Sequence, residues 1–152
     1  MSNWLYENKE ISSLEDFPEE TFGFIYKVTY LPTNVTYIGK KSLYHNTKKK
    51  LGKKELEALP TTRGRKSTTK IVTKESDWKT YYGSAKPILE LLKEKRHDEF
   101  DREILQFVNS KKLLTYYECK YLFKYGVLEH PTLYFNDNIL GKFFTKDFAS
   151  QD

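Results

Sequence analysis

Two tyrosines and one glutamate are the residues of this chain whose types and spacing suggest chemistry. Tyr26 and Tyr37 lie in two extended-looking segments separated by ten residues, enough for two short strand arms and a tight connection. Glu118 lies in a helical pattern where Leu114 and Leu122 would share its face, so a carboxylate is misplaced there. A carboxylate can bind a hard cation such as Mg²⁺, and phenols can handle a proton or position a water molecule. Glu118 is therefore a candidate metal ligand, and the two tyrosines are candidates for the same site.

Each of these residues also has a purely structural interpretation. Paired strand tyrosines are ordinarily core or cross-strand packing, because aromatic pairs are favoured in sheets. Glu118 would form a capping box with Thr115, three residues before it. Such a box would start the helix at Thr115 and leave Leu113 and Leu114 outside it, which favours the metal-ligand interpretation of Glu118.

A β-hairpin is expected to position the two tyrosines. Aromatic and β-branched residues alternate with other residues over 21–30, a period of two that predicts a strand. Turn residues follow at 31–34, and extended chemistry resumes over 35–38 before Gly39. The two strands should therefore pair.

The remaining elements complete a ββαβα order. Their predicted positions are a helix from the N-cap Ser84 to 94 with Pro87 in its first turn, a strand over 100–107, and a helix over 110–125 that stops at Gly126. Residues 132–136 are expected to pair briefly, and 139–144 form an apolar closing segment. The pattern predicts an α+β domain with a small, mostly antiparallel three-stranded sheet flanked by helices.

The length of 152 residues predicts one domain. We expect an N-terminal arm over 1–20, the domain itself over 21–145, and a tail over 146–152. A polar, lysine-rich insert over 40–80 follows the second strand, with a short helix between Lys53 and Leu59 as its expected regular element.

The basic charge of the chain is concentrated in this insert. The net charge is +5, but residues 40–80 hold 13 lysines and arginines against 4 acids, so the remainder is slightly acidic. Clustered cations indicate a binder of phosphate backbones, although a solvated loop would look the same. The candidate DNA-binding residues are Lys48, Lys49, Lys50, Arg63, Lys66, Trp78 and Lys86.

The motifs resemble those of the GIY-YIG nuclease family. Phe24-Ile25-Tyr26 and Tyr37-Ile38-Gly39 are similar to its two name-giving motifs, with Phe24 in place of the first glycine. The similarity continues over residues 22–136, through Gly83-Ser84-Ala85-Lys86, the strand from Phe100, Glu118 and the step Phe135-Asn136. The resemblance implies an endonuclease that hydrolyses DNA phosphodiesters with Mg²⁺ or Mn²⁺ on Glu118.

The resemblance also implies roles for the other residues of the site. Tyr26 would be the general base or its relay, and Tyr37 would position water or phosphate. A free tyrosine titrates near pH 10, so a cation must lower its pKa, and Lys40 and Lys41 are the nearest candidates.

Two further roles stay open at this point. The family arginine has no counterpart eight residues past Gly39, where the chain has Thr47. Arg65 is favoured for its role, with Arg63, Lys41 and Lys86 as alternatives. Asn136 would anchor backbone, orient Glu118, or simply occupy a turn.

DNA is the expected partner, and no membrane-spanning run is present. The single Cys119 fits a reducing compartment, so a cytoplasmic location is expected. A single site cuts one strand at a time, which leaves a homodimer open, and any protein partner is unknown. Small stand-alone members of the family are frequent in phage genomes, so the resemblance implies a phage or mobile-element origin. The alternative function is a catalytically impaired DNA-binding or inhibitor protein. The nuclease interpretation requires Tyr26, Tyr37 and Glu118 to converge on one basic concave surface.

Overall fold

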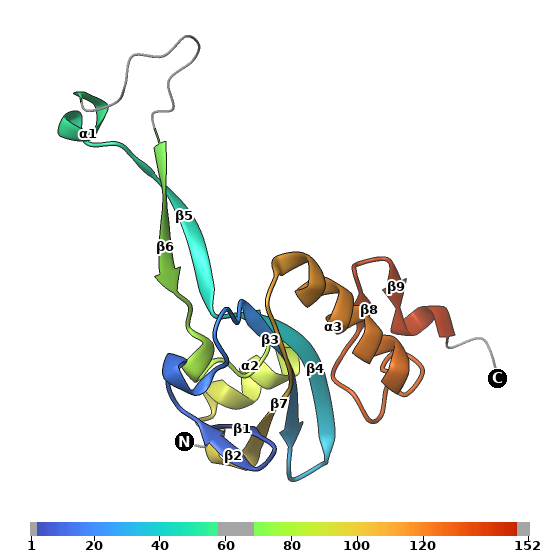
Figure 1. Ribbon diagram of the computed structural model, residues 1–152. Coiled ribbons are helices and arrows are strands. Elements are labelled where there is room, and N and C mark those ends of the chain that lie inside the picture. Colours follow the sequence, from blue (N-terminus) through green and yellow to red (C-terminus); the bar gives the residue numbers. More distant parts are fainter. Residues whose placement is uncertain (1–2, 58–68, 149–152) are drawn as a thin grey trace. The chain divides into compact units, whose positions relative to one another are not determined.

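The computed structural model describes residues 3–57 and 69–148 and divides the chain into two compact units (Figure 1). The first unit comprises residues 1–43 and 77–152, and the second comprises residues 44–76. The second unit is therefore inserted into the first. The elements of the chain are β1 (Trp4–Tyr6), β2 (Lys9–Ile11), η1 (Leu14–Asp16), β3 (Gly23–Tyr30), β4 (Val35–Ser42), β5 (Tyr44–Lys50), α1 (Lys53–Glu57), β6 (Thr69–Glu75), η2 (Trp78–Thr80), α2 (Lys86–Lys93), η3 (His97–Glu99), β7 (Phe100–Val108), α3 (Lys111–Tyr125), β8 (Asn138–Ile139), β9 (Phe143–Phe144) and η4 (Thr145–Phe148).

The predicted hairpin forms one side of the sheet of the first unit. β3 and β4 pair antiparallel over their whole length, and Tyr26 lies directly opposite Gly39. β3 also pairs antiparallel with β7, so it is an inner strand, whereas β4 lies at the edge of the sheet. Tyr26 is therefore held in the interior of the sheet, and Tyr37 lies on its last strand.

The sheet has five strands, in the order β2-β1-β7-β3-β4, and the prediction of three was wrong (Figure 1). The two additional strands come from the N-terminal segment. β1 pairs parallel with β7 at Leu5 and Glu103, and β2 pairs antiparallel with β1. The sheet is therefore mixed, with one parallel pairing among antiparallel ones.

Two helices cover the two faces of the sheet. On one face Phe24, Tyr26 and Val28 pack with Ile88 of α2. On the other face Ile25 and Ile38 pack with apolar residues of α3. Successive residues of β3 thus belong to two hydrophobic cores, one on each face of the sheet, as expected for a strand that is buried on both faces.

The helix that carries Glu118 has the predicted limits. Ser110 is its N-cap, and its hydroxyl accepts a hydrogen bond from the Leu113 backbone N–H at 3.1 Å. Gly126 ends it in the left-handed conformation, with φ 59°. Because the helix begins at Lys111, Thr115 lies inside it, and the capping-box interpretation of Glu118 is excluded.

α2 begins later than predicted, at Lys86. Its N-cap is Ala85, which makes no capping hydrogen bond with its side chain, and Pro87 lies in the first turn. The Ser84 hydroxyl is instead 3.0 Å from the hydroxyl of Tyr37 and hydrogen-bonds with it. The expected N-cap therefore supports the candidate site rather than the helix.

The inserted unit contains more regular structure than its sequence predicted. β5 and β6 form a seven-residue antiparallel hairpin, and α1 occupies Lys53–Glu57, within the predicted helix. Arg63, Arg65 and Lys66, which were expected to bind DNA or serve catalysis, lie outside the described residues.

Candidate active site

Tyr26 and Tyr37 approach each other across the β3–β4 pair, and β4 is the edge strand of the sheet. Their ring centroids are 6.1 Å apart. Tyr26 is buried, with 1% of its surface exposed, and its ring also packs against Trp4 and Tyr81. Tyr37 is half-buried and reaches the surface beside Ser84. One phenol of the pair therefore lies in the buried core, and the other lies at the surface beside the edge strand.

Gly39 makes this approach possible. A Cβ atom at Gly39 would lie 2.6 Å from the Tyr26 hydroxyl oxygen, 2.8 Å from its Cζ and 3.0 Å from Cε1 of Tyr37. These distances are shorter than any ordinary carbon contact, so a side chain here would displace the phenols. The last residue of the second tyrosine motif is glycine because the Tyr26 ring lies directly over its Cα atom.

Glu118 lies beside this edge strand. Its carboxylate accepts a hydrogen bond from the Lys40 backbone N–H and lies near the Lys40 ammonium group. Burial raises the pKa of Glu118, and both interactions with Lys40 oppose that rise. The Lys40 ammonium also donates a hydrogen bond to Thr115 Oγ1 at 2.8 Å, which ties β4 to α3. Glu118 is therefore a half-buried carboxylate with one adjacent cation.

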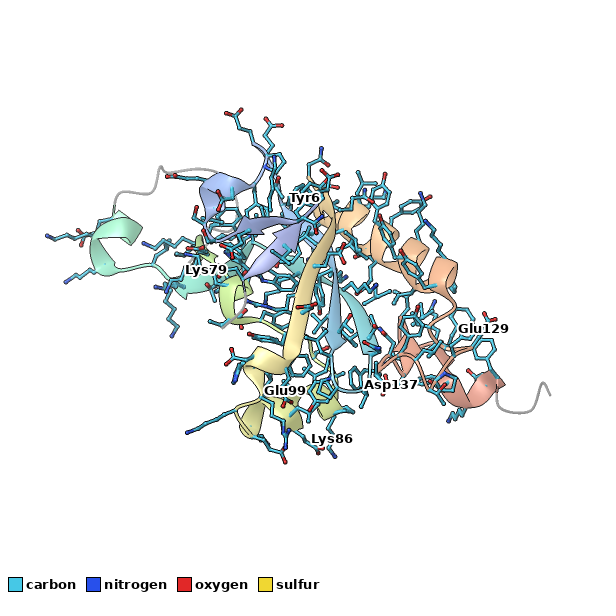
Figure 2. All side chains as sticks on the ribbon, turned by 90° about the horizontal axis from the view of Figure 1, so that it is seen from below. Tyr6, Lys79, Lys86, Glu99, Glu129 and Asp137 are labelled. Atoms are coloured by element: carbon cyan, nitrogen blue, oxygen red, sulfur yellow. The ribbon has the colours of Figure 1, made fainter. Side chains whose placement is uncertain are left out.

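Tyr37 and Glu118 line the same pocket, of about 210 Å³. Asn136 lines this pocket and fixes its own segment to β4: its Oδ1 accepts from the Ile38 N–H at 3.1 Å, and its Nδ2 donates to the Ile38 carbonyl at 2.8 Å. Both amide atoms are used on backbone, so of the three expected roles the structure selects the anchor. Asp137, labelled in Figure 2, follows directly and lines the pocket as well.

Residues 4–139 match the family model described as "Putative endonuclease segE, GIY-YIG domain". The chain belongs to the GIY-YIG nuclease family. No curated protein and no solved structure matches the chain.

The departure from the GIY-YIG pattern at Phe24 has a packing explanation. Phe24 is fully buried, and its ring centroid lies 5.0 Å from that of Trp4 on β1 and 5.8 Å from that of Phe17. The N-terminal segment thus supplies aromatic partners that a glycine could not contact. The sequence alone could not reveal this, because Trp4 and Phe24 are brought together by the pairing of β1 with β7.

The two lysines after Gly39 do not act on the buried phenol as expected. Lys41 forms an ion pair with Asp77 and lies 4.0 Å from the centre of the Tyr81 ring, while Lys40 interacts with Glu118 and Thr115. Burial, the neighbouring phenols, a hydrogen bond with Tyr81 and the charge of Glu118 raise the pKa of Tyr26 well above its ordinary value. Desolvation is the largest cause of this rise, and among the described residues Lys40 and Lys41 interact with other groups, so the expected lowering of the pKa by a cation stays a prediction.

Burial also raises the pKa of Tyr37, although its hydrogen bond with Ser84 opposes the rise. Both tyrosines of this GIY-YIG site are therefore neutral phenols at physiological pH. A neutral phenol donates a hydrogen bond, so each can interact with an anionic oxygen.

A second pocket, of about 270 Å³, lies on the same strand and carries three lysines. Lys40, Lys41 and Lys111 line it together with Tyr81 and Leu114. Lys111 is a candidate that the sequence reasoning missed, since the first residue of an exposed helix turn carries no distinctive pattern. This lysine pocket supplies the positive charge that no arginine supplies among the residues described.

Arg102 is another residue that the sequence reasoning missed, and it holds the segment that packs against Tyr26. It is 2% exposed, lies between the Trp4 and Tyr82 rings, and donates hydrogen bonds of 2.9 Å to the carbonyls of Lys79 and Tyr81. Since Tyr81 contacts Tyr26, Arg102 fixes the segment against which the buried phenol packs. An arginine in an otherwise ordinary strand pattern gave no sign of this role.

Two predicted DNA-binding residues differ in their outcome. Trp78 is fully buried, and its carbonyl accepts a hydrogen bond from Trp4 Nε1 at 2.7 Å, so its expected role as a stacking surface was wrong. Lys86, labelled in Figure 2, is exposed at the start of α2. Lys48, Lys49 and Lys50 belong to the inserted unit.

The donor set around Glu118 is compatible with a hard divalent cation. Within residues 3–57 and 69–148, no group of three or more histidine, cysteine, aspartate or glutamate side chains is arranged to hold a metal. The pocket does offer the carboxylates of Glu118 and Asp137 and the hydroxyl of Tyr37, all oxygen donors. Mg²⁺ favours such a site, because it retains several waters and shares ligands with substrate phosphate.

No helix of the described ranges is long and apolar enough to cross a membrane.

Proposed function

We propose that this GIY-YIG protein is an endonuclease that hydrolyses DNA phosphodiester bonds with a divalent metal, Mg²⁺ or Mn²⁺, held on Glu118. The observation that carries the proposal is the shared pocket of Tyr37 and Glu118, together with the packing of the Tyr26 ring against Tyr37 and over Gly39. DNA as the substrate follows from the nuclease family to which the chain belongs.

The two phenols are proposed to act as hydrogen-bond donors. Hydrolysis concentrates negative charge on the non-bridging oxygens of the phosphate as the water attacks. Since their pKa values are raised, Tyr26 and Tyr37 keep their protons and can donate to these oxygens or orient the attacking water. The role of general base or its relay stays the alternative prediction for Tyr26.

The charged groups are proposed to bind the two ends of the reacting phosphodiester. Glu118 would hold the metal, which neutralises phosphate charge and activates water when bound. Lys40, Lys41 and Lys111 would bind a neighbouring phosphate in the lysine pocket, as point charges in place of an arginine. Asn136 would keep β4 and the Asp137 segment in position through its two hydrogen bonds to Ile38.

Nicking of supercoiled plasmid tests this function. The purified protein is incubated with plasmid in Mg²⁺ and in EDTA, together with Glu118→Gln and Tyr26→Phe. Matched controls are Glu90→Gln on the exposed face of α2 and Tyr116→Phe, which is 60% exposed on α3. We expect both site variants to cut at least about 100-fold more slowly, and both controls to cut normally.

Two results would contradict the proposal. Equal nicking by the native protein and Glu118→Gln would exclude the metal site. A salt-sensitive shift of DNA without cleavage by any form, in Mg²⁺ or Mn²⁺, would identify a binding module instead of an enzyme.

A further inference from the structure

The two strands β5 and β6 of the inserted unit form a ribbon whose residues are almost all exposed. Every residue of β5 is exposed, and in β6 only Val72 is half-buried. An isolated hairpin of this kind is marginally stable in water, so packing does not explain its composition. The charge of the ribbon therefore requires another explanation.

The cross-strand register separates the lysines onto two faces. Residues directly opposite each other in an antiparallel pair share a face, and successive residues alternate. The cationic face carries His45, Thr47, Lys49, Lys70, Val72 and Lys74. The mixed face carries Tyr44, Asn46, Lys48, Lys50, Thr69, Ile71, Thr73 and Glu75. The hydrogen bond of 2.7 Å from Thr73 Oγ1 to Asn46 Oδ1 agrees with this division.

The run Lys48-Lys49-Lys50, continuous in sequence, is thus divided between the faces. Lys49 lies directly opposite Lys70, and His45 lies opposite Lys74. Neither strand places an acid on the cationic face, whereas Glu75 lies on the mixed face. Like charges directly opposite each other repel, and a polyanion bound along this face would relieve that repulsion.

We propose that the β5–β6 ribbon binds duplex DNA in the major groove through its cationic face. The inference rests on the proposed function for the identity of the polymer. Paired strands lie about 4.8 Å apart, and the major groove, about 12 Å wide, admits a two-stranded ribbon. Seven residues span about 20 Å, so Lys49, Lys70 and Lys74 can reach phosphates and base-edge acceptors along the groove.

The shape and composition of the ribbon favour duplex DNA over other nucleic acids. The major groove of duplex RNA is deep and too narrow for side chains to read. Proteins that bind single strands stack bases on aromatic rings, and the cationic face has only His45 as an aromatic side chain. Lysine and threonine can instead donate to the acceptors that the major groove of DNA displays.

The test compares two double variants that remove the same charge from opposite faces. Lys49→Gln with Lys70→Gln alters the cationic face, and Lys48→Gln with Lys50→Gln alters the mixed face. Binding of a fluorescein-labelled 20-base-pair duplex is measured by anisotropy in EDTA over a range of salt concentrations. Removing two phosphate contacts should reduce the slope of log K against log salt by about 1.8. We expect this loss for the cationic-face variant and less than half of it for the mixed-face variant.

Three outcomes overturn the inference. The first is an equal loss of slope for the two variants. The second is binding of a single strand of the same length that is as tight and as dependent on Lys49 and Lys70 as binding of the duplex. The third is native binding by the cationic-face variant. Unfolding is checked by comparing the thermal denaturation of the two double variants, which remove the same charge.

The failure of this inference is distinct from the failure of the proposed function. Plasmid nicking by a protein whose binding ignores the ribbon would overturn the inference alone. If the protein binds duplex DNA through the ribbon but never cuts it, the inference is supported and the proposed nuclease activity is contradicted.

Discussion

Replacing Gly39 by alanine should destabilise the fold through one identified contact. The new Cβ would lie 2.6 Å from the Tyr26 hydroxyl, whereas ordinary van der Waals contacts begin at 3.4 Å, so an atom must shift by about 0.8 Å. The Tyr26 ring is fixed by Trp4 at 5.3 Å and Tyr81 at 5.8 Å. Overpacking of this kind costs about 1–3 kcal/mol. Urea unfolding followed by tryptophan fluorescence measures it, because Trp4 contacts the ring that must move.

A double-mutant cycle connects this cost to the hydroxyl group. Tyr26→Phe removes the nearest atom and leaves Cζ at 2.8 Å, so Gly39→Ala should cost less in that background, by at least about 0.5 kcal/mol. Gly52→Ala is the control, because a Cβ there meets nothing within 4 Å, and its effect should stay within about 0.5 kcal/mol. An unchanged urea midpoint for Gly39→Ala, or the same cost in both backgrounds, would refute the explanation.

Three further changes test other parts of the site. Because burial raises the pKa of Glu118, ionisation of this carboxyl destabilises the fold as the pH rises through the folded-state pKa. In EDTA, Glu118→Gln should therefore be at least as stable as the native protein at pH 7. Urea titrations should show that this difference vanishes below about pH 4. Arg102→Met removes two hydrogen bonds and a cation between aromatic rings and should cost about 2–4 kcal/mol in guanidinium unfolding; an unchanged midpoint would contradict its anchoring role. Asn136→Ala leaves the Ile38 backbone groups without side-chain partners, so calorimetry should show a melting temperature several degrees lower, whereas a shift below one degree would argue against the anchor.

The parts of the fold that the sequence predicted are those with strong local patterns. The alternation in β3 and the turn before β4 determine the hairpin, and Ser110 with Gly126 determines both ends of α3. These signals involve residues close together in the chain. They were sufficient to predict the meeting of the two tyrosine motifs and the buried setting of Glu118.

The parts that were missed depend on contacts between distant residues. β1 has three residues, too few for a period of two to be recognised, and it becomes a strand because Leu5 pairs with Glu103. β5 consists largely of lysine and polar residues, which have low strand propensity, and its structure follows from pairing with β6.

The electrostatics of the site were predicted least well. Sequence proximity placed Lys40 and Lys41 next to the tyrosine pair, but Lys40 lies on the other face of β4, and Lys41, although it shares the face of the tyrosines, has an acidic partner. Lys41 interacts with Asp77, and Tyr26 is surrounded by aromatic rings, so burial determines its pKa. The spacing of charged residues along a sequence does not show which side chains become buried, so it cannot predict a pKa that burial determines.

The inserted unit leaves and re-enters the first unit at two positions joined by an ion pair, because Lys41 and Asp77 flank it on either side. The entropy of closing a loop changes slowly with length, by about 0.6 kcal/mol for each doubling. A ribbon of another length or composition could therefore be exchanged at this junction with little cost to the remaining fold. A different hairpin could be grafted between Leu43 and Asp77 while the first unit, which holds the candidate site, keeps its own fold.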